Sequence, residues 1–231
     1  MEIDIDKIKY LQWGFFKLNA TLLFSLIVII LLVVGAWLGT RSLTDDVKIK
    51  RSQALLESIV TIILQQIEEA TQQKPEKYLP FIGTLFLYIV TSNILEIMPG
   101  FRAPTASLST TAALACCVFV AVPVFGIATM GFKEYMRHYI QPTPLMLPFN
   151  IIGEFSRTVA LAVRLFGNIL SGSLIVAVLV SLTPLFFPVI MRAFGLLIGI
   201  IQAYVFAILA LVYIASANQA YKTEQTEKKN T

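Results

Sequence analysis

The sequence predicts an all-α polytopic membrane protein with about five membrane-crossing helices, of which the last two form a long inclined hairpin, together with an amphipathic surface helix. Of its 231 residues, 57% are hydrophobic and 14% are charged, whereas an ordinary soluble domain is roughly 45–50% apolar. Several apolar runs reach the roughly 20 residues with which a helix crosses a hydrocarbon core. Basic residues cluster between these runs, as topological anchors do. The net charge of +4 therefore needs no nucleic-acid partner.

The first apolar run covers residues 18–39 and predicts the first membrane helix, after an N-terminal segment of residues 1–17. The run is longer than the roughly 7–15 apolar residues of a cleavable signal peptide. We therefore expect it to remain as a membrane helix.

Residues 47–73 predict an amphipathic helix on the cytoplasmic side. Its apolar side chains recur at helical spacing, at Leu55, Leu56, Ile59, Val60, Ile63 and Ile67. Glutamates and glutamines occupy the other faces, which makes a membrane span improbable. The helix is expected either to lie flat on the bilayer or to pack on a partner.

A core of four further helices is predicted over residues 78–217. Apolar runs at about 78–97 and 107–130 predict two further spans. The segment 141–148 contains three prolines and cannot continue a regular helix, so a structured turn is expected there.

The last two apolar stretches, 149–182 and 189–217, are too long for upright spans. The first has some 34 residues without proline, which makes about 50 Å of helix at roughly 1.5 Å per residue. A hydrocarbon core is only about 30 Å thick, so the two helices are expected to form an inclined hairpin. The polar residues 218–231 predict a disordered cytoplasmic tail.

The basic residues also predict the orientation. Lysines and arginines are most numerous on the side that carries the C-terminal tail, and the other side has Lys7, Lys9, Lys17 and Arg102. By the positive-inside rule, the N-terminus faces outward and the C-terminus faces the cytoplasm or its equivalent.

Arg164 is the most informative single residue, because it interrupts the apolar residues 159–180. Burying an arginine in lipid costs at least about 2.5–3.5 kcal/mol on insertion scales, and its guanidinium cannot escape by losing a proton. The functional hypothesis is that Arg164 stabilises an anion that visits it. The structural alternative is an internal carboxylate partner. The nearest candidate, Glu154, lies ten residues away, about 15 Å along the helix, and is better placed to meet Arg157.

Arg164 belongs to a polar stripe. Residues seven apart lie within about 20° of each other around a helix, so one face carries Asn150, Arg157, Arg164 and Ser171. Small residues flank this stripe, which permits another helix or water to come close.

The final helix offers a complementary surface. Small residues recur every four positions, at Gly195, Gly199, Ala203 and Ala207. Gln202 stands beside them, and its amide is expected to find partners at Arg164 and Asn168. Arg192 is a second intramembrane cation, which either snorkels toward the interface or takes part in transport.

These motifs together resemble subunit a of the F-type ATP synthase, the stator subunit of its membrane motor. The block from Arg164 to Asn168 reads Arg-Leu-Phe-Gly-Asn, and it follows Gln-Pro-Thr-Pro at 141–144 and Leu-Pro at 147–148. The run at 201–206 reads Ile-Gln-Ala-Tyr-Val-Phe. The resemblance covers roughly residues 80–217.

The resemblance implies a non-catalytic, ion-translocating subunit with two ion half-channels and no nucleotide site, cofactor or metal. Its implied partners are a c-ring of small two-helix subunits, the peripheral-stalk subunit b and membrane lipid, in a hetero-oligomeric complex. Arg164 is then the stator arginine, with Asn168 and Gln202 as polar neighbours and with Arg157 and Glu154 in supporting positions. The implied location is a bacterial inner membrane or, alternatively, a thylakoid membrane.

Two positions depart from the family's pattern. Many proton-driven members carry a carboxylate shortly after the asparagine and a histidine before the glutamine, where this chain has Ser173 and Gly195. These positions are compatible with a water-filled path, or with a sodium-translocating branch in which hydroxyls such as those of Ser171 and Ser173 serve a hydrated cation. Gly195 and Gly199 are assigned supporting positions in the channel. The coupling ion, H⁺ or Na⁺, is therefore left open.

A secondary transporter that binds an anionic substrate at Arg164 is the alternative function. Such proteins are built from internal repeats with interrupted helices. No repeat is visible in this sequence.

Overall fold

A computed structural model describes residues 9–13, 16–41, 51–71, 75–98, 101–140, 146–182 and 187–229. Within them the elements follow in the order β1 (Lys9–Trp13), β2 (Phe16–Asn19), α1 (Ala20–Arg41), α2 (Arg51–Thr71), η2 (Pro75–Lys77), α3 (Leu79–Leu95), η3 (Pro104–Ala106), α4 (Leu108–Met130), α5 (Phe132–Ile140), α6 (Met146–Leu182) and α7 (Phe187–Lys229). Residues 1–8 of the N-terminal segment and 141–145 of the expected proline-rich turn lie outside this description.

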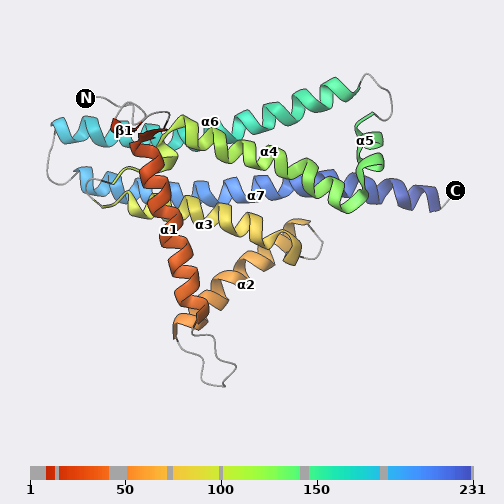
Figure 1. Ribbon diagram of the computed structural model, residues 1–231, viewed down its shortest axis with the longest axis horizontal. Helices are drawn as coiled ribbons and strands as arrows, with labels where there is room; N and C mark the ends of the chain where they lie inside the picture. Colours follow the sequence, from red (N-terminus) through yellow and green to blue (C-terminus); the bar gives the residue numbers. More distant parts are fainter. Residues whose placement is uncertain are drawn as a thin grey trace.

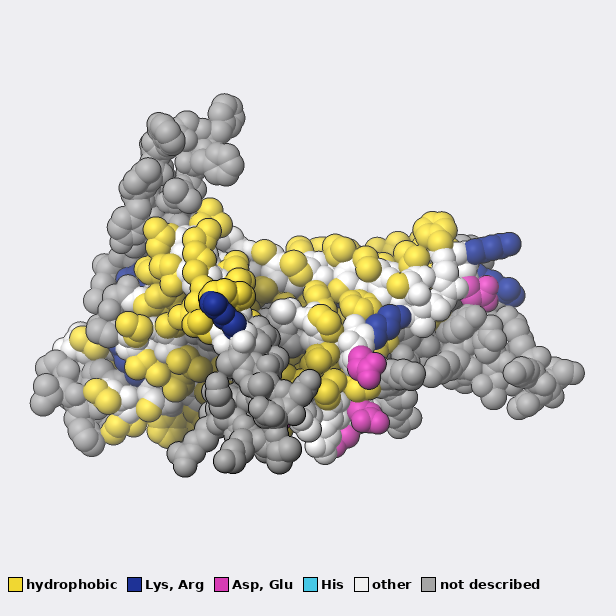
Figure 2. Space-filling model, turned by 60° about the horizontal axis from the view of Figure 1, so that its bottom comes forward, with side chains coloured by type: hydrophobic (Ala, Val, Ile, Leu, Met, Phe, Trp, Pro, Cys, Tyr) yellow, Lys and Arg dark blue, Asp and Glu magenta, His cyan; other side chains and the backbone are white. Residues whose placement is uncertain are grey.

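The predicted class, an all-α polytopic membrane protein, is confirmed. Four of the described helices, α1, α4, α6 and α7, are long and apolar enough to cross a membrane. The apolar helix α3 has 17 residues, or about 26 Å at 1.5 Å per residue. Hydrophobic side chains cover most of the described surface in Figure 2, and charged side chains are few there. A small antiparallel hairpin of β1 and β2, which the sequence does not predict, precedes α1.

Both helices of the long hairpin extend beyond their predicted bounds. α6 begins at Met146, so Pro148 lies in its first turn, where a missing backbone N–H breaks no helical hydrogen bond. α7 continues to Lys229, through residues predicted to be a disordered tail. These residues are rich in lysine, glutamate and glutamine, which favour helix. They also extend a helix that already exists, so no new nucleus has to form.

The short helix α5 is a second element that the sequence does not predict. It follows Gly131, whose φ of 84° is a backbone conformation that glycine adopts without strain. Tyr135 of α5 turns back onto Gly126 of α4 and is only 3% exposed. A Cβ atom on Gly126 would lie 2.5 Å from Cε2 of the Tyr135 ring. The missing side chain of Gly126 is thus what allows α5 to dock.

The helices run in two directions. In Figure 1, α3, α4, α6 and α7 follow the long axis of the molecule, whereas α1 crosses that axis. Side-chain contacts hold α1 in place: the hydroxyls of Ser25 and Tyr88 are 2.7 Å apart, and the rings of Phe24 and Phe101 meet edge to face at 4.8 Å. The α6–α7 hairpin is therefore strongly inclined to α1.

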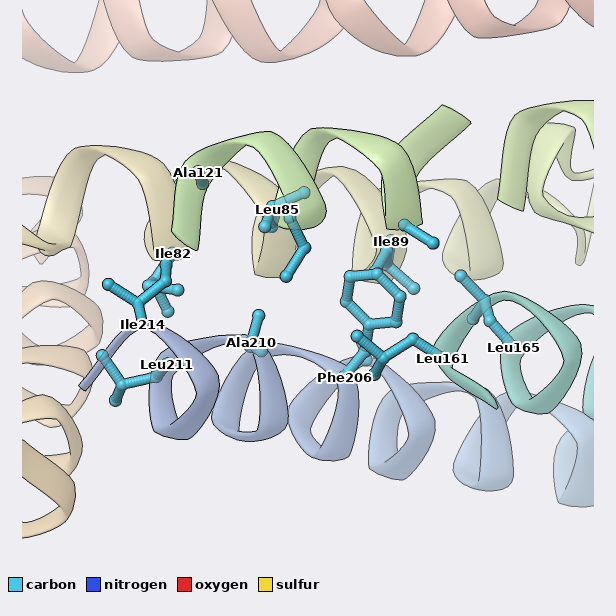
Figure 3. Close-up of a cluster of buried hydrophobic side chains, with 14 of the residues drawn as sticks. Ile82, Leu85, Ile89, Ala121, Leu161, Leu165, Phe206, Ala210, Leu211 and Ile214 are labelled. Atoms are coloured by element: carbon cyan, nitrogen blue, oxygen red, sulfur yellow. The ribbon is translucent and has the colours of Figure 1, made fainter. Parts of the chain in front are cut away.

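The core lies where α3, α4, α6 and α7 meet. Figure 3 shows Ile89 of α3, Leu165 of α6 and Phe206 of α7 in this cluster, and each is 0% exposed. Ala203 and Ala210 of α7 are buried as well, and such small side chains let helices approach closely. This packing fixes how α6 and α7 are rotated about their axes, and so decides which way Arg164 points.

The amphipathic helix α2 packs on its own chain, against α3 and α7. Its side chains Ile67 and Thr71 are each 1% exposed. The Tyr204 hydroxyl on α7 donates a hydrogen bond to Oε1 of Gln66. One face of α2 is thus covered by α3 and α7 of the same chain, while Ile59, Val60 and Ile62 of the same helix remain exposed.

Candidate functional site

Arg164 stands on the exposed side of α6. The helix buries a stripe formed by Leu161, Ala162, Leu165 and Ile169, and Arg164 lies beside this stripe with an exposed side chain. Among the residues whose side chains are described, no carboxylate pairs with it. The alternative of an internal carboxylate partner for Arg164 thus finds no support among the described side chains.

The contact between Arg157 and Tyr213 sets the register of the hairpin. The Arg157 guanidinium carbon lies over the Tyr213 ring, 5.5 Å from its centroid, which is a cation–π arrangement. Asn168 is eleven residues after Arg157, and Gln202 is eleven residues before Tyr213. Because α6 and α7 run antiparallel and rise equally per residue, Asn168 and Gln202 lie at the same level of the hairpin.

Gln202 is more deeply placed than the sequence suggests. Its side chain is 9% exposed, whereas Arg164 is exposed and Asn168 is half-buried. Its Nε2 atom has no hydrogen-bond partner among the described residues. A buried amide N–H without a hydrogen-bond partner costs roughly 1–3 kcal/mol of stability. We therefore expect a group outside the described chain, or water, to accept its hydrogen bond.

A cavity of ≈ 610 Å³ opens between α3, α6 and α7. One water molecule occupies about 30 Å³, so the space is large enough for a chain of waters. Five of the residues predicted from the sequence line it: Asn168, Ser171, Ser173, Gly195 and Gly199. Arg164 and Gln202 are not among its lining residues, and Arg157 and Glu154 lie farther toward the N-terminus of α6.

The two serines present oxygen lone pairs. The hydroxyl of Ser171 donates to the carbonyl oxygen of Asn168, and that of Ser173 to Leu170, both at 2.9 Å. Each hydroxyl proton is thus used within the helix, and each oxygen can still accept a hydrogen bond or a cation. No cluster of three or more metal-binding side chains occurs among the described residues.

Asn93 is a candidate site residue that the sequence analysis missed. Its Nδ2 atom donates to the carbonyl oxygen of Gly199 at 2.9 Å, and Thr105 donates to its Oδ1 at 3.5 Å. Asn93 also lines the cavity and is 4% exposed. Its amide therefore ties α3 to α7 at the wall of the cavity.

Glu96 is the second missed residue. It follows α3 directly and lines the cavity, as does Arg192 of α7. Asn93 and Glu96 are three residues apart in an otherwise apolar run. That spacing, which places them on one helical face, is the signal that could have identified them.

The chain matches a known family over most of its length. A family model for the ATP synthase A chain matches residues 22–215. A protein of Crocosphaera subtropica named "ATP synthase subunit a 1" is 60% identical over 216 residues, which cover 94% of each chain. "ATP synthase subunit a 2" of Acaryochloris marina is 57% identical over 219 residues, 95% of this chain and 94% of the relative. "ATP synthase subunit a" of Albidiferax ferrireducens is 53% identical over 222 residues, 96% of each.

Proposed function

The chain belongs to the ATP synthase A chain family, and on that premise we propose that its Arg164 is the stator arginine that faces the ion-binding carboxylate of a rotating c-ring. The protein is an integral membrane subunit of a multi-subunit complex. The single observation that carries the proposal is an exposed arginine in the middle of a long apolar helix, with no carboxylate partner among the described side chains.

The chemistry follows from the permanent charge of the guanidinium. A ring carboxylate arrives neutral, with its proton or metal ion bound. An arginine nearby favours the charged form of that carboxylate, so the ion is released. Since arginine cannot deprotonate, it also repels cations that would pass directly between the two aqueous paths. The subunit itself performs no nucleotide chemistry.

The cavity supports an outer half-channel. It extends from Asn168, one turn after Arg164, toward Val180 on α6 and Met191 on α7. These residues lie near the turn of the hairpin, which the distribution of basic residues places on the outer side. We propose that ions enter here and that the second half-channel reaches Arg164 from the cytoplasmic side.

The proposed coupling ion is H⁺ or Na⁺. Ser173 and Gly195 leave the cavity wide where other family members carry titrating side chains, and nothing lies within 4 Å of a Cβ built on Gly195. A water-filled path serves either ion. The ring carboxylate, which holds the ion during rotation, is then the main determinant of selectivity.

The proposed complex contains the c-ring, peripheral-stalk subunit b and lipid, in a bacterial inner membrane or a thylakoid membrane. The N-terminus is outside and the C-terminus is cytoplasmic. The transporter alternative requires interrupted helices, whereas α6 is continuous through Arg164 and α7 through Gln202.

Purification of the chain in mild detergent tests the proposal. We expect it to elute with a ring of small two-helix subunits and with ATP hydrolysis activity from its associated catalytic subunits. Elution as an isolated protein that binds an anionic solute through Arg164 would overturn the proposal in favour of the transporter.

A further inference from the structure

Arg157 is a second exposed arginine on the Arg164 face of α6. The two residues are seven apart, so they lie within about 20° of each other around the helix and about 10.5 Å apart along it. Arg157 is the nearer of the two to the N-terminus of α6, which is the direction from which the proposed cytoplasmic half-channel reaches Arg164. Among the described side chains, no carboxylate pairs with Arg157. Its charge is therefore presented to whatever passes along this face.

The ring of Tyr213 on α7 holds the Arg157 guanidinium in place. The guanidinium carbon lies over the ring, 5.5 Å from its centroid, in a cation–π contact. The ring itself is firmly placed, because Tyr213 is half-buried and packs against the buried core. An arginine that only snorkels extends toward the nearer interface, whereas this side chain reaches across the hairpin onto the neighbouring helix. The contact thus fixes the position of a long side chain that carries a permanent charge.

The other charged side chains around this end of α6 balance one another. α4 contains no charged residue, and the charged residue of α7 among its described side chains, Arg192, lies near the hairpin turn. α6 itself and α5, which packs against it, contribute two charges of each sign among their described side chains, at Glu154, Lys133, Glu134 and Arg137. The excess positive charge on the Arg164 face at this level therefore comes from Arg157.

We propose that Arg157, held by Tyr213, is a second fixed cation of the cytoplasmic half-channel, and that it sets how readily the ring carboxylate loads and releases its ion on that side. Tyr213 is a positioning residue, because it acts through Arg157. The inference deepens the proposed function and rests on it, since it requires the second half-channel to reach Arg164 along this face.

The physical reasoning concerns the carboxylate while it is open to cytoplasmic water. When the carboxylate is near Arg164, Arg157 is on the order of 10 Å away. A positive charge at that distance favours the charged form of the carboxylate. During ATP synthesis it helps the ion to leave toward the cytoplasm, and during ATP hydrolysis it opposes loading from the cytoplasm. Between effective dielectric constants of 20 and 80, one such charge changes the binding equilibrium by about twofold to fifteenfold.

The test uses the complete ATP synthase in proteoliposomes with the cytoplasmic face outward. ATP-driven ion uptake is measured while the outside concentration of the coupling ion is varied, for H⁺ and for Na⁺. Arg157→Gln is expected to lower the half-saturating concentration by about twofold to fifteenfold, because loading is no longer opposed. Arg157→Lys keeps the charge and should remain closer to the parent value. The half-saturating concentration inside the vesicles, measured during ion-driven synthesis, should change much less.

Substitutions of Tyr213 test the positioning role. Tyr213→Leu removes the ring face and should shift the outside half-saturating concentration in the same direction as Arg157→Gln, but by less. Tyr213→Met is the second variant if Tyr213→Leu does not assemble, and Tyr213→Phe, which keeps the ring, should stay near the parent value. Tyr213→Leu combined with Arg157→Gln should shift no further than Arg157→Gln alone, because a residue that acts through another adds nothing once that one is removed.

Lys133→Gln is the matched control for charge. Lys133 is exposed and lies on α5, so this variant removes a positive charge on the same side of the membrane but away from the Arg164 face. The outside half-saturating concentration should then stay at the parent value. An equal shift in Lys133→Gln, no shift in Arg157→Gln, or equal shifts on the two sides of the membrane would overturn the role of Arg157. Additive shifts in the double variant would overturn the role of Tyr213.

Arg164→Ala in the same preparation reports separately on the proposed function. If that variant still couples ion flow to synthesis, the stator assignment fails. If it does not couple and Arg157→Gln leaves the outside half-saturating concentration unchanged, only this inference fails.

Discussion

Asn93 on α3 donates a hydrogen bond from its side-chain amide to the backbone carbonyl of Gly199 on α7, at 2.9 Å. The contact needs glycine at position 199, because a Cβ there would lie 2.9 Å from Nδ2 and 3.0 Å from Cγ of Asn93. Backbone and amide can meet only because no side chain intervenes.

Gly199→Ala is therefore expected to destabilise the assembled subunit by about 1–3 kcal/mol, the usual effect of overpacking. Thermal unfolding of the detergent-solubilised complex measures this. Gly195→Ala is the matched control, since nothing lies within 4 Å of its added methyl group. Equal loss of stability in the two variants would contradict the role assigned to Asn93.

Arg164→Ala is expected to reduce ion-driven ATP synthesis to background while the subunit still inserts and assembles, because the side chain is exposed and makes no described ion pair. Arg164→Lys should fail or nearly fail, since a compact ammonium does not reproduce the planar guanidinium. Synthesis in inverted membrane vesicles, with subunit content checked by immunoblot, measures both. Near-normal synthesis by the lysine variant would remove the stator assignment.

Two alanines on α6 test the direction in which the Arg164 face points. Ala160 is exposed and lies one turn before Arg164, whereas Ala162 is 8% exposed. With a second cysteine placed near the ring carboxylate, Ala160→Cys should form a disulfide crosslink and Ala162→Cys should not. The opposite pattern would mean that the ring approaches a different face. Gln202→Cys, at a position 9% exposed, is expected to crosslink weakly.

Ser173→Ala is expected to change turnover only modestly, because the cavity that Ser173 lines is large enough for a chain of waters, and to leave the ion preference unchanged. The Ser173 hydroxyl proton bonds to its own helix at Leu170. ATP-driven ion uptake across a sodium titration at fixed pH measures the preference. A switch of coupling ion would show that this subunit sets selectivity.

The fold class was accessible from the sequence because helix length and apolarity are local properties. Apolar stretches of about 20 residues or more predict α1, α4, α6 and α7 directly. The docking of α5 depends on Tyr135 meeting Gly126, a contact between two helices that no periodicity encodes. The helical continuation of α7 to Lys229 was missed because polar composition alone does not separate a solvated helix from disorder.

In the candidate site, too, some residues could be predicted from local sequence and others depend on tertiary contacts. Arg164, Asn168 and Gln202 were proposed from the sequence because they lie in short motifs within apolar runs. Asn93 and Glu96 were missed because their importance depends on α3 lying beside α7. The sequence placed Gln202 on the correct helix. That its side chain is only 9% exposed follows from tertiary packing.

The length of α6 has a consequence for the timing of ion transfer. Its 37 residues make about 55 Å of helix at 1.5 Å per residue, and a helix of this length fits within a hydrocarbon core of about 30 Å only if its axis is strongly tilted. Two points at different depths on such a helix are also displaced laterally. Arg157 and Ser171, fourteen residues apart, are then separated by about 21 Å along this slanted line. A carboxylate that travels past the helix reaches such laterally displaced points one after the other. The slant of the helix therefore fixes the order in time in which the carboxylate passes points that differ in depth.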